Sequence, residues 1–177
     1  IINSCSNIKE NTVVFGKLKN GDNVFKYLLK NSNCEVEVIT YGGIITSIKV
    51  PDMNNNLIDI ALGFNNLDAY LEGHPYFGAI VGRFANRIDN GKFLINEEEY
   101  KLAINNNGTS LHGGIKGFDK VNWNVVNYDY LNKRSIKLNY LSKHMEEGYP
   151  GNLDIYVTYT LLDDNELKVE YLSLIHI

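Results

Sequence analysis

The sequence predicts an all-β protein built as an antiparallel β-sandwich. Three observations support this class. Apolar and polar residues alternate with a period of two in many short segments, Tyr and Val are frequent within these segments, and Gly and Asn recur at short intervals between them. A period of two places alternate side chains on opposite faces of a strand, and β-branched and aromatic residues favour strands. Closely spaced turn residues favour stacked antiparallel sheets over helices.

The first half of the chain contains four candidate strands and one helical turn. The alternating segments are residues 24–29, 34–40, 44–50 and 57–62. Residues 66–72 are expected to form one turn or a short helix, because Leu67, Tyr70 and Leu71 recur at helical spacing.

The second half is predicted to be strands joined by turns. A hairpin should connect residues 92–95 to 100–103 through the polar stretch 96–99. Alternation returns in three further segments, at 136–140, 153–161 and 167–171. No repeat, low-complexity linker or second domain boundary is visible. The chain then ends on apolar residues 173–177 without a cap or turn, which predicts a truncated chain or an altered reading frame.

Composition excludes several classes of function. A length of 177 residues allows one domain with a real core, and 44% hydrophobic with 21% charged residues is ordinary for a globular protein. A net charge of −4 with scattered basic residues argues against nucleic-acid binding. No apolar run approaches the ~20 residues that span a bilayer, and no signal peptide is evident. Cys5 and Cys34 could pair, but two cysteines favour a reducing, cytoplasmic setting.

Two polar clusters between strand-like segments are the candidate site. Asn86 and Arg87 lie in the first, residues 85–93, and His112 lies in the second, residues 105–114, before Gly113-Gly114. The planar guanidinium of arginine can hold two sugar hydroxyls at once. An imidazole suits proton transfer or hydrogen bonding to a hydroxyl near neutral pH. Arg83 competes with Arg87, because both would point to one face if 84–88 were extended.

Each of these residues also has an ordinary structural interpretation. Arg87 could pair with a surface carboxylate, and His112 could be a satisfied polar residue in a turn. Aromatic residues that could stack on a pyranose, or pack in the core, are Tyr76, Phe77 and Trp123. Adjacent Glu146 and Glu147 are interpreted as solvated and non-catalytic. His, Cys, Asp and Glu show no compact ligand spacing, so no metal site is predicted.

With the residues between them, the two clusters closely resemble the signature of the aldose 1-epimerases (galactose mutarotases). The likeness runs from about residue 15 to 171, which leaves 1–14 as a poorly defined start and 172–177 as a tail outside the family. Segments beyond the clusters that look like the family are 41–50, 59–64, 74–79, 146–151 and 157–161. The resemblance implies a β-sandwich of the galactose mutarotase type, of which this chain is the N-terminal portion.

The same resemblance implies an isomerase of free aldohexoses such as galactose and glucose, with no cofactor and no metal. An acid protonates the ring oxygen, a base takes the proton of the anomeric hydroxyl, and the ring opens, rotates at C1 and closes as the other anomer. Asn86 and Arg87 match the family's substrate-binding pair, and His112 matches its first active-site histidine.

The sequence departs from the family in one respect. The family's second histidine lies in an Asn-His-x-Tyr type of segment and its basic glutamate lies further along, and neither is found within residues 1–177. His176 lacks the flanking pattern, so the role is not transferred to it. The 177 residues alone are therefore expected to be inactive or nearly so. Two alternatives remain, a non-catalytic carbohydrate-binding sandwich and a hexose-phosphate 1-epimerase. The oligomeric state is not predicted.

Overall fold

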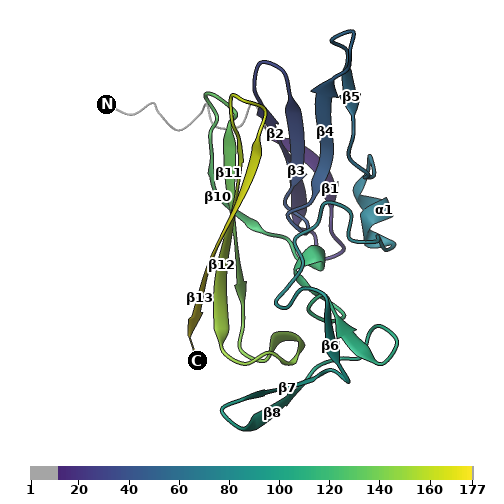
Figure 1. The fold of residues 1–177 in the computed structure, drawn as a ribbon, viewed down its shortest axis with the longest axis vertical. Helices are drawn as coiled ribbons and strands as arrows, with labels where there is room; N and C mark the ends of the chain where they lie inside the picture. Colours follow the sequence, from purple (N-terminus) through teal and green to yellow (C-terminus); the bar gives the residue numbers. More distant parts are fainter. Residues whose placement is uncertain (1–11, 177) are drawn as a thin grey trace.

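A computed structural model describes residues 12–176, with His176 described only in its backbone. Two antiparallel sheets lie face to face (Figure 1). The five-stranded sheet follows chain order and consists of β1 (Val13–Lys17), β2 (Asn23–Lys30), β3 (Glu35–Ile39), β4 (Ile45–Pro51) and β5 (Leu57–Asp59). The four-stranded sheet also follows chain order, with β10 (Asn124–Tyr128), β11 (Ser135–Ser142), β12 (Asn152–Leu161) and β13 (Leu167–His176). The predicted antiparallel sandwich is confirmed.

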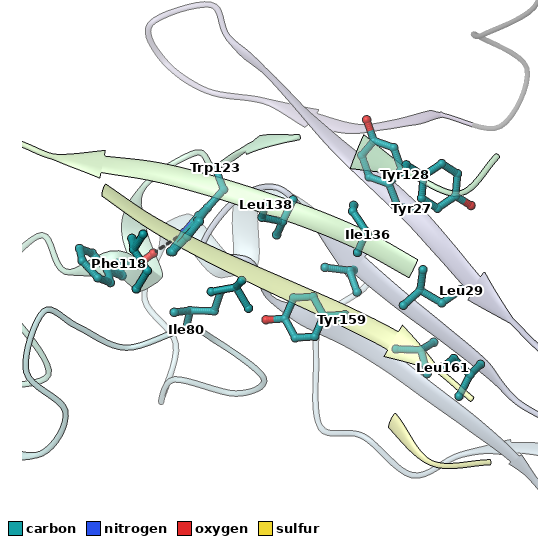
Figure 2. Close-up of a cluster of buried hydrophobic side chains, with 14 of the residues drawn as sticks. Tyr27, Leu29, Ile80, Phe118, Trp123, Tyr128, Ile136, Leu138, Tyr159 and Leu161 are labelled. Atoms are coloured by element: carbon teal, nitrogen blue, oxygen red, sulfur yellow. Dashed lines mark hydrogen bonds between the residues drawn. The ribbon is translucent and has the colours of Figure 1, made fainter. Parts of the chain in front are cut away.

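The core lies between the two sheets, where their inward-facing side chains meet. On β12 every second residue is buried, including Val157 and Tyr159, as the alternation predicts. These side chains pack with Val36 and Val38 of β3 and with Leu29 of β2 (Figure 2). Full burial of one such aliphatic side chain contributes roughly 1.5–3 kcal/mol, so this layer is the main source of stability.

The hydroxyl of Tyr159 lies within this layer and forms a hydrogen bond across the sandwich. The Tyr159 hydroxyl donates a hydrogen bond to the carbonyl oxygen of Gly43 at 2.7 Å. Burial raises the pKa of this phenol, so it remains a neutral donor. The bond joins the four-stranded sheet to the turn between β3 and β4, near the end of the sandwich that carries the smaller sheets.

Two small two-stranded sheets lie at one end of the sandwich (Figure 1). One pairs β6 (Arg87–Asp89) with β9 (Thr109–Leu111), and the other pairs β7 (Lys92–Ile95) with β8 (Glu98–Lys101). The predicted hairpin is present, but its connection is shorter than expected. Asn96 and Glu97 both have positive φ, 49° and 68°, which is the two-residue turn that matches the twist of paired strands.

The single α-helix described is α1 (Leu67–Leu71), which confirms the helical turn predicted for this region. Its N-cap is Asn66, whose side-chain oxygen accepts a hydrogen bond from the Ala69 N–H at 3.0 Å. Two 3-10 turns, η1 (Phe118–Lys120) and η2 (Glu146–Gly148), complete the described elements. None of the helices within residues 12–176 is long and apolar enough to cross a membrane.

Two strands, β5 and β13, end three or more residues from the predicted position. β5 stops at Asp59, whose side-chain carboxylate takes the place of a backbone acceptor and accepts the N–H groups of Ile48 and Ala61, both at 3.0 Å. β13 continues past the predicted end to His176 and pairs with β12 along its whole length. Its side chains Tyr171 and Ile175, 62% and 52% exposed, lie on the same face as buried residues of β12.

Candidate active site

The β6–β9 ladder brings the two polar clusters of the sequence together. Arg87 is paired with Leu111, so the residues just outside the ladder, Asn86 and His112, lie opposite each other. The His112 N–H donates to the Asn86 carbonyl oxygen at 2.9 Å. The three residues predicted from the sequence therefore come together at one end of a short sheet.

His112 is held by its ring as well as by its backbone. The Asn86 N–H donates to Nδ1 of the imidazole at 2.9 Å. An accepting Nδ1 carries no proton, so the ring proton of the neutral imidazole lies on Nε2. The half-buried ring therefore offers an N–H donor from Nε2.

Arg87 is exposed and lies beside this pair. Its Nη1 donates to the side-chain oxygen of Asn86 at 3.0 Å, and its Nε donates to the side-chain oxygen of Asn106 at 3.2 Å. These two bonds orient the plane of the guanidinium, and Nη2 donates to no acceptor among residues 12–176. An arginine fixed in this way keeps donors for a ligand.

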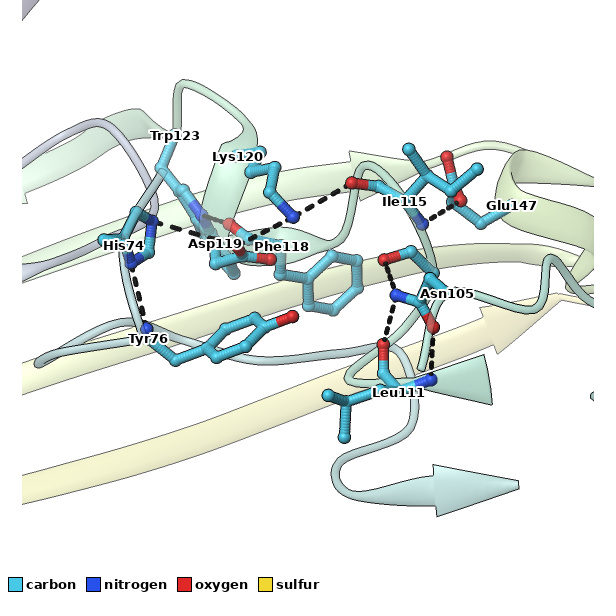
Figure 3. Close-up of polar contacts among 11 residues, drawn as sticks. His74, Tyr76, Asn105, Leu111, Ile115, Phe118, Asp119, Lys120, Trp123 and Glu147 are labelled. Carbon is cyan, nitrogen blue, oxygen red and sulfur yellow. Dashed lines mark hydrogen bonds and ion pairs between the residues drawn. The ribbon is translucent and has the colours of Figure 1, made fainter. Parts of the chain in front are cut away.

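A side chain that the sequence reasoning missed fixes the turn that carries His112. Asn105 donates from Nδ2 to the carbonyl oxygens of Leu111 and Gly114, at 3.0 and 2.7 Å, and accepts the Leu111 N–H at 2.6 Å (Figure 3). One amide thus spans the turn from both ends. Asparagine side chains commonly replace backbone partners in this way, which was the available signal in the Asn-rich stretch.

The two glycines after His112 lie against other segments of the protein. A Cβ on Gly113 would overlap the Gly82 carbonyl, and a Cβ on Gly114 would overlap the Glu147 carboxylate. Both glycines have positive φ, 91° and 118°. The absence of a Cβ at both positions lets the turn pack against neighbouring loops, and this packing fixes the position of His112.

Arg83, which the sequence left as an alternative to Arg87, lies in a separate set of hydrogen bonds. Its guanidinium donates to the Ser142 hydroxyl and to the backbone carbonyls of Ser142, Lys143, Pro150 and Gly151, at 2.8–2.9 Å. Residues 84–88 do not form an extended segment, because Asn86 has a φ of 66°. Burial lowers the pKa of this guanidinium, and the charge of Glu146 opposes that effect.

The aromatic candidates have different positions. Trp123 is 2% exposed and donates from its indole to the Phe118 carbonyl at 3.1 Å, so it belongs to the core (Figure 2). Phe77 is half-buried and lies against Phe64, with ring centroids 6.4 Å apart. Tyr76 alone reaches the site, because its ring packs edge-on against His112 with centroids 4.5 Å apart.

The two glutamates are anchors and not freely solvated groups. Glu146 accepts hydrogen bonds from the Tyr140 hydroxyl, at 2.5 Å, and from the Ser142 hydroxyl. Glu147 accepts the Ile115 N–H at 2.7 Å (Figure 3). These bonds attach the η2 turn to β11 and to the loop after His112, so the interpretation of the two glutamates as simply solvated is wrong.

A buried polar pair adjoins the site and was not anticipated. The side chains of His74 and Asp119 are each 1% exposed, with His74 Nε2 3.8 Å from an Asp119 carboxylate oxygen (Figure 3). Lys120 Nζ lies 3.3 Å from the same oxygen. Burial lowers the pKa of His74, and the Asp119 charge partly opposes this. Within residues 12–176, no group of three His, Cys, Asp or Glu could hold a metal ion.

Comparison with known proteins assigns the family. The model of the aldose 1-epimerase family matches residues 26–174. The chain belongs to the aldose 1-epimerase family. Among curated proteins of the family, galactose mutarotase from Sus scrofa is 47% identical over 159 residues, which are 89% of this chain and 45% of the pig protein. Aldose 1-epimerase from Haemophilus influenzae is 40% identical over 144 residues, 81% of this chain and 41% of that protein.

Solved structures of aldose 1-epimerases share the fold. An aldose epimerase homologue from C. elegans superposes with a TM-score of 0.81 at 28% identity, over 85% of this chain and 46% of that one. Galactose 1-epimerase from Lactobacillus acidophilus superposes with a TM-score of 0.77 at 23% identity, over 93% and 48%. The chain thus spans a little under half the length of these aldose 1-epimerases.

Proposed function

We propose that this chain carries the sugar-binding part of an enzyme that interconverts the α and β anomers of free aldohexoses such as galactose and glucose. One observation supports this most directly. Asn86 is hydrogen-bonded both to the guanidinium of Arg87 and to the imidazole of His112, so the two groups that match the family pattern are held together.

Each residue contributes a donor suited to an uncharged polyol. Arg87 would donate from its outer nitrogen to sugar hydroxyls, with its plane fixed by Asn86 and Asn106. His112 would be the catalytic residue of this part and would donate from Nε2 to an oxygen near C1, where charge develops as the ring opens. The ring of Tyr76 would form an apolar wall beside the sugar.

The reaction itself moves two protons and needs no redox step. The anomeric hydroxyl loses a proton to a base, the ring oxygen gains one from an acid, and the C1–O5 bond breaks to give the open aldehyde. Rotation about C1–C2 and the reverse steps give the other anomer. By resemblance, the acid and the base are a second histidine and a glutamate outside these 177 residues. We therefore propose that the chain alone gives little or no rate enhancement, since one general acid or base typically supplies ~10²–10⁴-fold.

Titration with galactose tests the proposal. Chemical shifts of ¹⁵N-labelled protein are followed for the wild type, for Arg87→Lys and for the matched control Arg134→Lys. Arg134 pairs with Asp163 in the loops at the opposite end of the sandwich (Figure 1). Arg87→Lys should weaken binding roughly tenfold, about 1.4 kcal/mol, because an ammonium lacks the fork, and Arg134→Lys should leave it unchanged.

Three results would contradict parts of the proposal. Shifts that avoid Asn86, Arg87 and His112 would place the sugar elsewhere. Tighter binding of galactose 6-phosphate than of galactose would favour the phosphate-specific alternative. Rapid conversion of fresh α-galactose by these 177 residues, followed by polarimetry, would show that the acid and base are already present.

We also propose a cytoplasmic setting, supported by the buried free thiol of Cys34; Cys5 lies outside the described residues.

A further inference from the structure

His74 and Asp119 have no part in the proposed sugar contacts, yet their burial is costly. Both carboxylate oxygens of Asp119 and Nε2 of His74 lack a hydrogen-bond partner among the described residues. The Lys120 ammonium, 3.3 Å from Asp119 Oδ2, offsets part of the cost of burying this carboxylate. The desolvation of a buried ion pair can exceed the attraction between its charges, and well-packed apolar side chains would avoid that cost. The pair therefore needs a reason beyond filling space.

The hydrogen bonds of His74 define how its ring is used. The Tyr76 N–H donates to His74 Nδ1 at 3.1 Å (Figure 3). The bond from Tyr76 therefore places the ring proton on Nε2 and joins the ring to the backbone of Tyr76. Nε2 lies 3.8 Å from Asp119 Oδ2, beyond hydrogen-bond distance, so the carboxylate attracts this side of the ring only electrostatically.

Tyr76 connects this pair to the site. Its φ is 62°, a left-handed conformation that a bulky residue adopts only when its surroundings impose it. Its ring packs on His112 at 4.5 Å, and Lys120 Nζ lies 5.7 Å from the ring centroid. A change in the Tyr76 backbone would therefore move the surface against which the His112 imidazole rests.

We propose that His74, buried beside Asp119, is a positioning residue that acts through Tyr76 to fix the orientation of the His112 imidazole toward the sugar. The effect on sugar binding rests on the proposed function, whereas the effect on His112 does not. No hydrogen bond joins His74 to His112 among the described residues, so His74 acts by packing and not by proton relay. Two potential ligands, a histidine and an aspartate, are also too few for a metal site.

Two amide variants test the roles of the two ring nitrogens of His74 separately. An Asn side-chain oxygen occupies the place of Nδ1 and can accept the Tyr76 N–H, so His74→Asn should preserve the held backbone. A Gln amide occupies the place of Nε2 and can donate to Asp119, but it offers no acceptor at the Nδ1 position. The control is His144→Gln, because His144 Nδ1 also accepts a backbone N–H, from Gly151 at 2.9 Å, in a separate loop.

Imidazole ¹⁵N spectra of sugar-free protein give the first readout, and the dissociation constant for galactose gives the second. In the wild type, His74 should be the neutral Nε2–H tautomer. His74→Gln should shift the His112 ring signals and weaken galactose binding roughly tenfold, about 1.4 kcal/mol. His74→Asn should retain near-wild-type values, and His144→Gln should change neither readout.

The outcomes distinguish this inference from the proposed function. An Nδ1–H tautomer of His74 in the wild type overturns it without the need for any variant. Equal effects of His74→Gln and His74→Asn, or unmoved His112 signals in a folded His74→Gln protein, also overturn it. Shifted His112 signals with no galactose binding by the wild type support the positioning role while rejecting the proposed function.

Discussion

Arg83 and Arg87 lie four residues apart, and the structure predicts opposite consequences when each is replaced by lysine. Arg83 makes five hydrogen bonds, each 2.8–2.9 Å long, to the segment from Ser142 to Gly151. Arg87 is exposed and makes two, both to exposed side-chain oxygens. The first set joins loops distant in sequence, whereas the second orients one side chain.

The magnitude follows from the number of acceptors left without a donor. A lysine has three N–H donors at a single point, so at least two of the five acceptors lose their partner. Each bond to a charged group is worth about 1.5–3 kcal/mol, with imperfect additivity. Arg83→Lys should therefore lower the free energy of unfolding by about 3–5 kcal/mol, a large share of the 5–15 kcal/mol typical of a domain. Arg87→Lys should lower it by under ~1 kcal/mol.

Urea unfolding monitored by tryptophan fluorescence measures this difference, because Trp123 is the sole tryptophan and is buried. At a slope of about 2 kcal/mol per molar urea, Arg83→Lys should move the midpoint down by about 2 M. Hydrogen exchange should accelerate first in the 142–151 segment. Equal midpoints for the two variants, or an Arg83→Lys protein of wild-type stability, would refute the assignment of Arg83 to a structural role.

Three further predictions follow from burial and backbone geometry. Gly113→Ala should unfold or displace the His112 turn, because the new Cβ would overlap a neighbouring carbonyl. The control Gly108→Ala has a similar φ but open space around it, so it should lower the free energy of unfolding by only about 1 kcal/mol. Thermal unfolding followed by circular dichroism compares the two variants. Burial raises the pKa of Tyr128 to about 12, so this phenol loses its proton at lower pH in the unfolded state than in the folded state. The free energy of unfolding should therefore fall as pH rises from about 10 to 12. In urea titrations at several pH values, Tyr128→Phe should reduce this fall. The chain should self-associate through the exposed apolar side of β13; Tyr171→Lys should reduce the particle size in light scattering, and the control Leu131→Lys, in an isolated turn, should not.

The fold was predictable because its determinants are local. Strict alternation on β12 and β11 reports which face of each strand is buried, and that pattern needs no knowledge of the partner sheet. The ends of the strands were harder to predict from the sequence. β5 ends where the Asp59 side chain replaces a ladder partner, and a side chain that captures backbone N–H groups leaves no mark on hydrophobic periodicity.

The site was predictable in its residue types but not in its supports. Arg87 and His112 are chemically distinctive and lie in turn-rich clusters that resemble a family signature. The choice between Arg83 and Arg87 depends on the left-handed backbone of Asn86, which a polar turn sequence does not specify. His74 and Asp119 are far apart in the sequence, so only the tertiary fold shows that they are buried together.

The end of the β6–β9 ladder explains why structure and chemistry are inseparable at His112. In an antiparallel ladder, a hydrogen-bonded pair exchanges two N–H to carbonyl bonds. Here His112 donates its N–H to Asn86, but the return bond from the Asn86 N–H goes to the imidazole and not to the His112 carbonyl. The left-handed φ of 52° at His112 turns its carbonyl away, and the ring takes that carbonyl's place.

This substitution does two things at once. It allows the chain to leave the ladder at Gly113 without an unsatisfied N–H at Asn86, and it fixes the proton of the imidazole on Nε2. The tautomer that the proposed chemistry uses is thus set by the hydrogen bond that ends the strand pair. A residue that cannot accept at the Nδ1 position would lose both functions, whereas a purely catalytic histidine could be replaced without disturbing the fold.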